Sequence, residues 1–313
     1  MGPVLTRAAV VGVGSLGQHH ARVWAELPGA TLAGVYDVDP GRAAEVAARH
    51  GVPALRHLRE VVEGADAVSV AVPTVDHHRV ARALMEAGRH VLVEKPMTAT
   101  LEEADDLVRL AAARGVVLQV GHVERFNPAV DVLREAAPAP RFIEVHRLAP
   151  FTPRSLDIDV VLDLMIHDLD ILLGLDGSEL VQVDAVGVPV LTAKPDIANV
   201  RLRFASGLIA NLTASRVSAE KVRKFRAFAP STYVSADLVA RQANVFRLVG
   251  DPERQEIAMD SRGAPDEEPL RRQLAAFLAA VEGRGPVVVS GADGRRVLAL
   301  AQRILAGISS QIA

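Results

Sequence analysis

The chain has 313 residues, a formal net charge of −3, and hydrophobic side chains at half of its positions. This length predicts two domains, and the apolar fraction is sufficient for packed cores. The nearly balanced charge gives no indication of a nucleic-acid or membrane partner. The sequence has no cysteine, which excludes disulfides, thiolate nucleophiles and cysteine-bound metals. Since no secretory leader or uninterrupted apolar stretch of roughly 20 residues is recognisable, we expect a cytoplasmic protein.

The first 120 residues alternate short apolar runs with amphipathic segments. Thr100 and Glu103 form a capping box that marks the start of one helix. Strand–helix alternation with short connections predicts a doubly wound parallel sheet, an α/β domain over residues 1–122. The predicted strands are 8–13, 31–36, 67–72, 90–93 and 116–120, and the predicted helices are 16–27, 42–50, 77–87 and 101–113.

The pattern changes after residue 121, where prolines become frequent and strand-like runs follow one another. Successive strands with little helix between them predict an α+β domain over residues 123–313 with a largely antiparallel open sheet. Residues 251–268 are charged and irregular, and we expect a surface loop there. The predicted strands are 181–188, 199–204, 208–215, 223–228, 233–239 and 244–249, and the predicted helices are 129–136, 160–173, 270–281 and 294–312.

A glycine-rich turn joins the first predicted strand to the first predicted helix. Gly12 permits a tight turn, Gly14 lets the backbone approach a pyrophosphate, and Gly17 allows the helix to pack closely on the strand. The helix N-terminus then offers amide groups to phosphates. The alternative is a glycine turn that binds nothing. We predict a dinucleotide site whose turn consists of Gly12, Gly14, Ser15, Leu16 and Gly17.

Asp37 stands 20 residues beyond Gly17, at the end of the second predicted strand. Its carboxylate can accept hydrogen bonds from ribose hydroxyls and would repel a 2′-phosphate, which favours NAD over NADP. Arg42 keeps NADP open as an alternative, because an arginine suits a 2′-phosphate.

Lysine is rare in this chain, with only four among 35 basic residues. Lys95 lies in the sequence Glu94-Lys95-Pro96, at the carboxyl end of a predicted parallel strand. Ligands of open α/β sheets bind outside that edge, where a lysine could contact a substrate hydroxyl and assist proton transfer. The alternative is a surface lysine at a strand end.

The predicted helix 160–173 carries polar residues among apolar neighbours. Asp163, His167 and Asp170 share an arc of roughly 60° on a regular helix, whereas Asp168 points elsewhere. A carboxylate beside an imidazole would orient it and support a general base. A structural polar network is one alternative and a metal site another, although one helix face supplies no closed ligand set. We interpret His19 and His20 as helix surface, and we predict no metal.

These segments together resemble the glucose–fructose oxidoreductase/inositol dehydrogenase/rhizopine catabolism (Gfo/Idh/MocA) family over nearly the whole chain. The resemblance rests on the glycine turn, on 71–74 with His77, on 87–96, and on the Asp163–His167–Asp170 pattern. It implies a Rossmann domain and an α/β domain whose open sheet forms a homodimer or homotetramer. It also implies an NAD-dependent dehydrogenase acting on the CH–OH group of a sugar.

The resemblance also implies roles for particular residues. Lys95, His167 and Asp163 would be catalytic, the last two also touching the substrate. The family commonly has glycines near the positions of Val161, Leu162 and Met165. This difference affects the expected shape of the substrate pocket more than the expected chemistry. The cofactor site would also include Pro73, Thr74, His77, Glu94 and Lys95.

Within the family, 121–128 and 164–168 look most like dehydrogenases that oxidise the 3-hydroxyl of UDP-N-acetylhexosamines. Arg125, Asn127 and Arg154 would bind such a substrate, since arginine suits phosphate; an ordinary surface position is the alternative for each arginine. Two other functions stay open: a dehydrogenase of a free polyol or sugar, and a non-catalytic NAD-binding regulatory protein.

Overall fold

The computed structural model describes residues 5–152, 158–251 and 254–312. Its chain forms two compact units, Met1–Val123 with Leu270–Leu298, and Glu124–Pro269 with Ala299–Ala313. The segment Leu270–Leu298 thus returns to the first unit, which a single boundary near residue 122 does not include. The assignment of 1–122 and 123–313 as domains stays a prediction.

The first unit contains a parallel sheet with strand order β3-β2-β1-β4-β5-β6. This confirms the predicted doubly wound sheet. The capping box of Thr100 and Glu103 is present at the start of α5. Two short elements, β3 and α3, were not predicted. The elements are β1 (Thr6–Val11), α1 (Gly17–Glu26), β2 (Ala30–Tyr36), α2 (Pro40–His50), β3 (Ala54–Leu55), α3 (Leu58–Gly64), β4 (Ala67–Val70), α4 (Thr74–Glu86), β5 (His90–Glu94), α5 (Leu101–Arg114) and β6 (Leu118–Gly121).

The core of this unit includes the returning helix α8 (Pro269–Val281). Phe277 of α8 meets Trp24 of α1 edge to face, with ring centroids 6.2 Å apart, and both rings are fully buried. The indole of Trp24 also donates a 2.9 Å hydrogen bond to the Ser69 hydroxyl. An edge-to-face pair of aromatic rings stabilises a fold by about 0.5–1.5 kcal/mol beyond the contribution of its buried area. These contacts fix α1, and with it the turn that precedes it.

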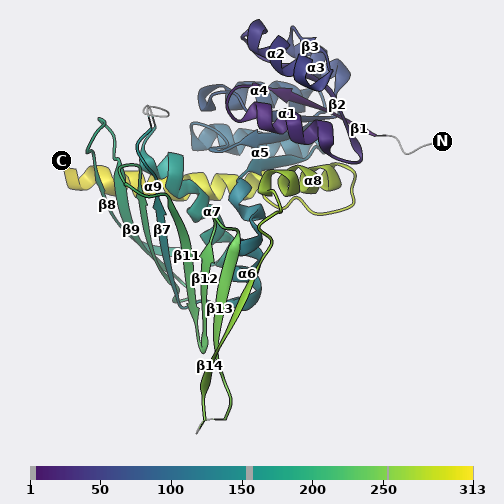
Figure 1. Cartoon of the computed structure of the whole chain (residues 1–313). Coiled ribbons are helices and arrows are strands. Elements are labelled where there is room, and N and C mark those ends of the chain that lie inside the picture. Colours follow the sequence, from purple (N-terminus) through teal and green to yellow (C-terminus); the bar gives the residue numbers. More distant parts are fainter. Residues whose placement is uncertain (1–4, 153–157, 252–253, 313) are drawn as a thin grey trace. The chain divides into compact units, whose positions relative to one another are not determined.

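The second unit contains a sheet ordered β14-β13-β12-β11-β7-β10-β9-β8 (Figure 1). Its neighbouring strands pair antiparallel except β7 with β10, so the prediction of a largely antiparallel sheet is confirmed. No helix within the described ranges is long and apolar enough to cross a membrane. The elements are η1 (Val123–Phe126), α6 (Pro128–Ala136), β7 (Phe142–Leu148), η2 (Val161–Met165), α7 (Ile166–Leu175), β8 (Leu180–Val188), β9 (Ile197–Phe204), β10 (Ile209–Ser215), β11 (Val222–Ala229), β12 (Thr232–Asp237), β13 (Gln242–Val249), β14 (Glu256–Gly263) and the C-terminal part of α9 (Gly291–Ile312), whose first residues belong to the first unit.

Two of these strands were not predicted. β7 has the alternation of a half-buried strand, but one of its inward positions holds Arg147, which interrupts the apolar pattern. The expectation of a loop at 251–268 is wrong for 256–263, because β14 pairs with β13 along its full length. Its side chains are mostly exposed, so no burial pattern marks it in the sequence.

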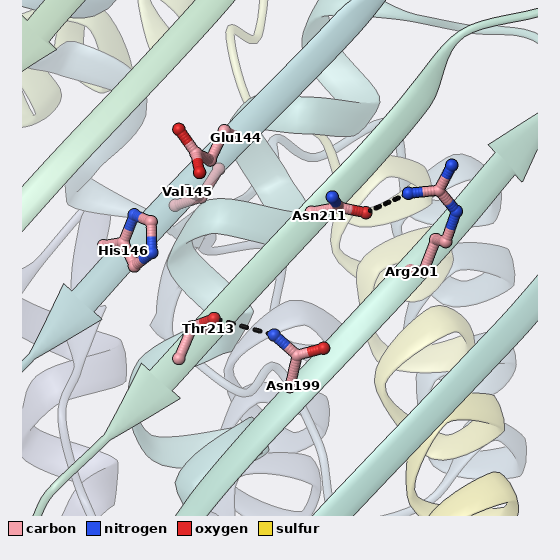
Figure 2. A pocket seen from close by; sticks show the side chains of 7 residues that line it. All are labelled: Glu144, Val145, His146, Asn199, Arg201, Asn211 and Thr213. Atoms are coloured by element: carbon pink, nitrogen blue, oxygen red, sulfur yellow. Dashed lines mark hydrogen bonds between the residues drawn. The ribbon is translucent and has the colours of Figure 1, made fainter.

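The two faces of this sheet differ. One face packs against α6 at β12–β14, against η2 at β10, and against the end of α9 at β8 (Figure 1). The other face carries a row of aromatic rings in contact, Phe142, Phe228, Tyr233 and Phe246, with successive centroids 5.5, 4.6 and 5.3 Å apart. Beside this row lies a polar hollow of about 280 Å³ on β7, β9 and β10 (Figure 2).

Candidate active site

The glycine turn has the geometry that a dinucleotide site requires. Gly12 has φ +84°, and a Cβ there would lie 2.7 Å from the Ala71 carbonyl oxygen. A Cβ on Gly17 would lie 1.8 Å from the Gly12 oxygen, so only glycine lets the helix pack this close. A Cβ on Gly14 would meet only the Arg42 guanidinium, at 4.0 Å, which leaves its backbone open to a ligand. The turn therefore fits a pyrophosphate.

Asp37 joins this turn to the end of β2. One carboxylate oxygen accepts a 2.8 Å hydrogen bond from the Val13 amide, and the other accepts a 2.9 Å hydrogen bond from the Asp39 amide. Arg42 lies 3.4 Å from Asp37 and 3.6 Å from Asp39, so its charge is partly balanced by two carboxylates. A carboxylate offers about four acceptor positions, which leaves Asp37 capacity for ribose hydroxyls.

Three apolar side chains lie exposed where β1, β2 and β4 end. Leu16, Val38 and Val75 are 52%, 85% and 76% exposed. Exposed apolar groups near polar anchors are typical of a ligand site, here one that could take a flat ring. Sequence periodicity did not single out Val38 or Val75, because one follows a strand and the other begins a helix.

The loop after β4 leads into α4. Pro73 is the N-cap of α4 and is exposed, and Thr74 is half-buried, so both can meet a ligand. His77 is 1% exposed, and its ring nitrogens lie 2.8 Å from the Pro96 oxygen and 2.9 Å from the Val72 oxygen. Burial lowers the pKa of His77 below its ordinary value. Its position favours holding the two loops together, and contact with a cofactor stays a prediction.

Lys95 follows β5 at the carboxyl edge of the sheet and is half-buried. Its peptide bond to Pro96 is cis. The neighbouring Glu94 is buried, and its carboxylate contacts the His20 ring at 3.0 Å and the Lys95 amide at 3.3 Å. The interpretation of His20 as helix surface is wrong, because it is 2% exposed. The Glu94 carboxylate therefore binds other groups of the protein, and its contact with the cofactor stays a prediction.

In the second unit, the predicted helix begins as the π-helical turn η2 and continues as α7. In a π-helix each hydrogen bond spans five residues, which changes the spacing of side chains around the axis. Asp163 in η2 and His167 in α7 are half-buried, whereas Asp170 is fully buried. The predicted three-residue face therefore divides, leaving Asp163 and His167 as the pair that a ligand could reach.

Asp170 is held by Arg125, which donates hydrogen bonds of 2.9 and 2.6 Å to its carboxylate and 2.8 Å to its backbone oxygen. Gly174 provides the space, because a Cβ there would lie 2.7 Å from the Arg125 guanidinium carbon. Arg125 is 9% exposed. Its geometry favours a structural role, and the substrate contact stays a prediction.

Glu124, Arg147 and Asp168 form a second buried charge network. Arg147 donates hydrogen bonds of 2.7 and 2.8 Å to Asp168 and one of 3.2 Å to Glu124, which also accepts one of 2.9 Å from Arg223. Burial alone would raise the pKa of Glu124, but the two arginines outweigh it and hold that pKa below its ordinary value. The network therefore carries charge inside the unit.

Asn127 belongs to the same network. Its side-chain oxygen caps α6 by accepting from the Ala129 amide, and its amide donates to Glu124 and to the Leu238 oxygen. It is 1% exposed, so its polar atoms are already occupied within the protein. Arg154, the third predicted substrate residue, lies outside the described residues. Among the described residues, no cluster of His, Asp and Glu side chains could hold a metal ion.

Comparison with known proteins agrees with this geometry. A family model described as "Oxidoreductase family, NAD-binding Rossmann fold" matches residues 6–122, and the GFO/IDH/MocA C-terminal domain matches residues 140–230. The chain is 42% identical over 310 residues to UDP-N-acetylglucosamine 3-dehydrogenase of Acidithiobacillus ferrooxidans, covering 97% of each chain. A solved structure of that enzyme superposes with a TM-score of 0.91, covering 98% of this chain and 99% of that one.

More distant relatives share the fold. The chain is 32% identical to scyllo-inositol 2-dehydrogenase (NAD(+)) of Bacillus subtilis over 237 residues, 68% of each chain. A levoglucosan dehydrogenase solved with NADH and levoglucosan has a TM-score of 0.86 at 20% identity, covering 98% of each chain. The glycine turn, the sheet order and these similarities agree: the chain belongs to the Gfo/Idh/MocA family of NAD-binding oxidoreductases.

Proposed function

We propose that this dehydrogenase oxidises the 3-hydroxyl of a UDP-N-acetylhexosamine with NAD. The observation that carries the proposal is the 42% identity, over 97% of both chains, to an enzyme named for that reaction. In the reaction the carbon-bound hydrogen leaves as hydride and the hydroxyl hydrogen leaves as a proton. The products are a 3-keto nucleotide sugar, NADH and a proton.

The proposed cofactor is NAD, held by the glycine turn and by Asp37. Bound NAD supplies the hydride acceptor. The open backbone at Gly14 and the exposed Leu16 support this fit. The position of Arg42 supports NAD over NADP, because this guanidinium already lies beside the carboxylates of Asp37 and Asp39.

The proposed proton chemistry belongs to Lys95, His167 and Asp163. Lys95 stabilises the developing alkoxide through its ammonium group, and His167 accepts the hydroxyl proton. Asp163 supports the protonated imidazole by its negative charge. The half-buried positions of all three residues support these roles, because each is reachable and yet partly desolvated. Arg154 remains the proposed ligand of the substrate phosphates.

A free polyol is the second candidate substrate. It is favoured by the 32% identity to scyllo-inositol 2-dehydrogenase, although that similarity covers 68% of the chain. Of the two candidates, only the nucleotide sugar carries a uridine diphosphate. Competition by free UDP therefore separates them.

We also propose that the protein is a homodimer or homotetramer joined through the face of the second unit's sheet that carries the aromatic row. The row of Phe142, Phe228, Tyr233 and Phe246 supports this, since aromatic rings are enriched in interfaces. Light scattering after size-exclusion chromatography tests it, and Phe228→Asp should shift the mass toward the monomer. The cytoplasm stays the predicted compartment.

The experiment that tests the substrate is a thermal-shift and absorbance screen with NAD, adding UDP-N-acetylglucosamine, UDP or myo-inositol in turn. We expect UDP-N-acetylglucosamine to raise the melting temperature and to produce absorbance at 340 nm. UDP should inhibit that reaction. Turnover of myo-inositol with no response to either uridine nucleotide would instead support the polyol.

A further inference from the structure

His20 and Glu94 form a buried pair next to Lys95. His20 lies in the first turns of α1, three residues after Gly17, and Glu94 is the last residue of β5. Their side chains meet at 3.0 Å between Nε2 and Oε1, with side-chain exposures of 2% and 10%. An ionised carboxylate only accepts hydrogen bonds, so Nε2 of His20 is the donor.

Glu94 is ionised although it is buried. Burial by itself raises the pKa of this carboxyl, but the hydrogen bond and electrostatic attraction of His20, together with the Lys95 amide, hold it below its ordinary value. A buried charge without a partner is strongly unfavourable, so the contact with His20 helps to keep this carboxylate in place.

Gly121 at the end of β6 restricts the carboxylate from another side. A Cβ on Gly121 would lie 2.5 Å from Oε1 and 2.9 Å from Oε2 of Glu94. The carboxylate thus lies against bare backbone, in a space that only glycine leaves open. It is confined between α1 and β6, where it reaches the backbone amide of Lys95.

The residue after Lys95 is held as well. The Pro96 carbonyl lies 2.8 Å from Nδ1 of His77, and the other ring nitrogen of His77 lies 2.9 Å from the Val72 oxygen. Histidine side chains thus contact the backbone on both sides of Lys95: His20 of α1 acts through Glu94, and His77 of α4 lies against the Pro96 carbonyl.

We propose that His20 is a positioning residue, which acts through Glu94 to fix the backbone from which the Lys95 side chain extends. The proposal rests on the proposed catalytic role of Lys95. Because α1 begins at the glycine turn, the same helix would set both the cofactor turn and the lysine. Fixed geometry matters here, since misplacing a catalytic group by about 1 Å can cost about a hundredfold in rate.

The chain offers matched variants for a test. His20→Leu removes the hydrogen-bond donor to Glu94, and His20→Asn provides a side chain too short to reach the position of Nε2. His20→Gln places an amide hydrogen near the position of Nε2 and should rescue. The control is His19→Leu, which changes the exposed neighbouring histidine on the same helix. The variants are compared by kcat at saturating substrates, by the Kd of NAD, and by hydrogen exchange of a peptide that covers Glu94–Met97.

We expect His20→Leu and His20→Asn to lower kcat at least about tenfold while the Kd of NAD changes less than about threefold. His20→Gln should stay within about threefold of wild type, and His19→Leu should not differ from it. Exchange in the Glu94–Met97 peptide should accelerate only in the Leu and Asn variants. That readout needs no turnover, so it also decides the matter for a variant of low activity or an unassigned substrate.

The proposal is overturned if kcat and the exchange of this peptide are unchanged in His20→Leu and His20→Asn. It is also overturned if their loss of activity follows a weaker Kd of NAD, because His20 would then serve the cofactor turn. Lys95→Met separates this from the proposed function. If Lys95→Met keeps wild-type turnover, the catalytic role of Lys95 fails; if it is inactive while His20→Leu is normal, only the positioning role fails.

Discussion

Arg147→Met should destabilise the second unit strongly, because it leaves a buried carboxylate without its main partner. Arg147 is 2% exposed and donates two hydrogen bonds to Asp168, which is also 2% exposed. Glu124 loses one partner but keeps Arg223 and Asn127. Removing one member of a buried ion pair costs about 3–5 kcal/mol, and we expect a loss of that size.

Urea unfolding followed by far-ultraviolet circular dichroism measures this loss. The single tryptophan, Trp24, lies in the other unit, so its fluorescence is a separate probe. The control is Arg226→Met, which breaks a 2.8 Å pair with Glu144 whose side chains are 39% and 31% exposed. A pair at such an accessible position is worth about 0–1 kcal/mol.

Two further results would follow if the reasoning is correct. Burial already raises the pKa of Asp168 above its ordinary value, against the attraction of Arg147. Without Arg147 that pKa rises further, so the loss of stability shrinks as the pH falls through the raised pKa. Arg147→Met combined with Asp168→Leu should recover part of the loss, because no unpaired carboxylate remains at that position. A loss below about 1 kcal/mol, or an equal loss in Arg226→Met, would refute the reasoning.

Three other predictions concern chemistry, cofactor and pH. Lys95→Met and His167→Asn should each lower kcat at least about a hundredfold with the fold intact by circular dichroism, and near-normal turnover of both would contradict their roles. Asp37→Ser should lower the ratio of kcat/KM for NAD to that for NADP at least about tenfold; an unchanged ratio would show that Asp37 does not select the cofactor. Backbone amides hold the pKa of Asp196 at about 2, after burial is offset. Its stabilisation is therefore present above the unfolded pKa of about 3.8 and is lost as the pH falls from there toward 2. Asp196→Asn should thus be less stable than wild type at pH 7 in urea unfolding, by an amount that decreases below pH 4, and a pH-independent difference would be the contrary result.

The parallel sheet could be predicted because its signals are local. The glycine turn marks the join of β1 and α1, and the capping box of Thr100 and Glu103 marks the start of α5. β7 and β14 lack such signals. Arg147 occupies an inward position in β7, and β14 is recognised only through its pairing with β13. Long-range partners define these strands, and sequence patterns do not show them.

The candidate site was predictable to the same extent. The turn from Gly12 to Gly17 has the expected geometry because steric limits on glycine are a local property. The acid–His helix was less predictable. The π-helical turn η2 departs from the side-chain spacing of a regular α-helix. Asp170 forms an ion pair with Arg125, which lies 45 residues away in the sequence. His20 was missed because its partner Glu94 is 74 residues away.

The most direct measurement of the central claim is hydride transfer from the proposed carbon. UDP-N-acetylglucosamine deuterated at C3 is incubated with the protein and NAD, and the NADH that forms is analysed by mass spectrometry. Our account predicts that deuterium passes from the sugar to the nicotinamide, and that this transfer is lost in Lys95→Met. Absence of transfer from this sugar, with transfer from deuterated inositol under the same conditions, would contradict it.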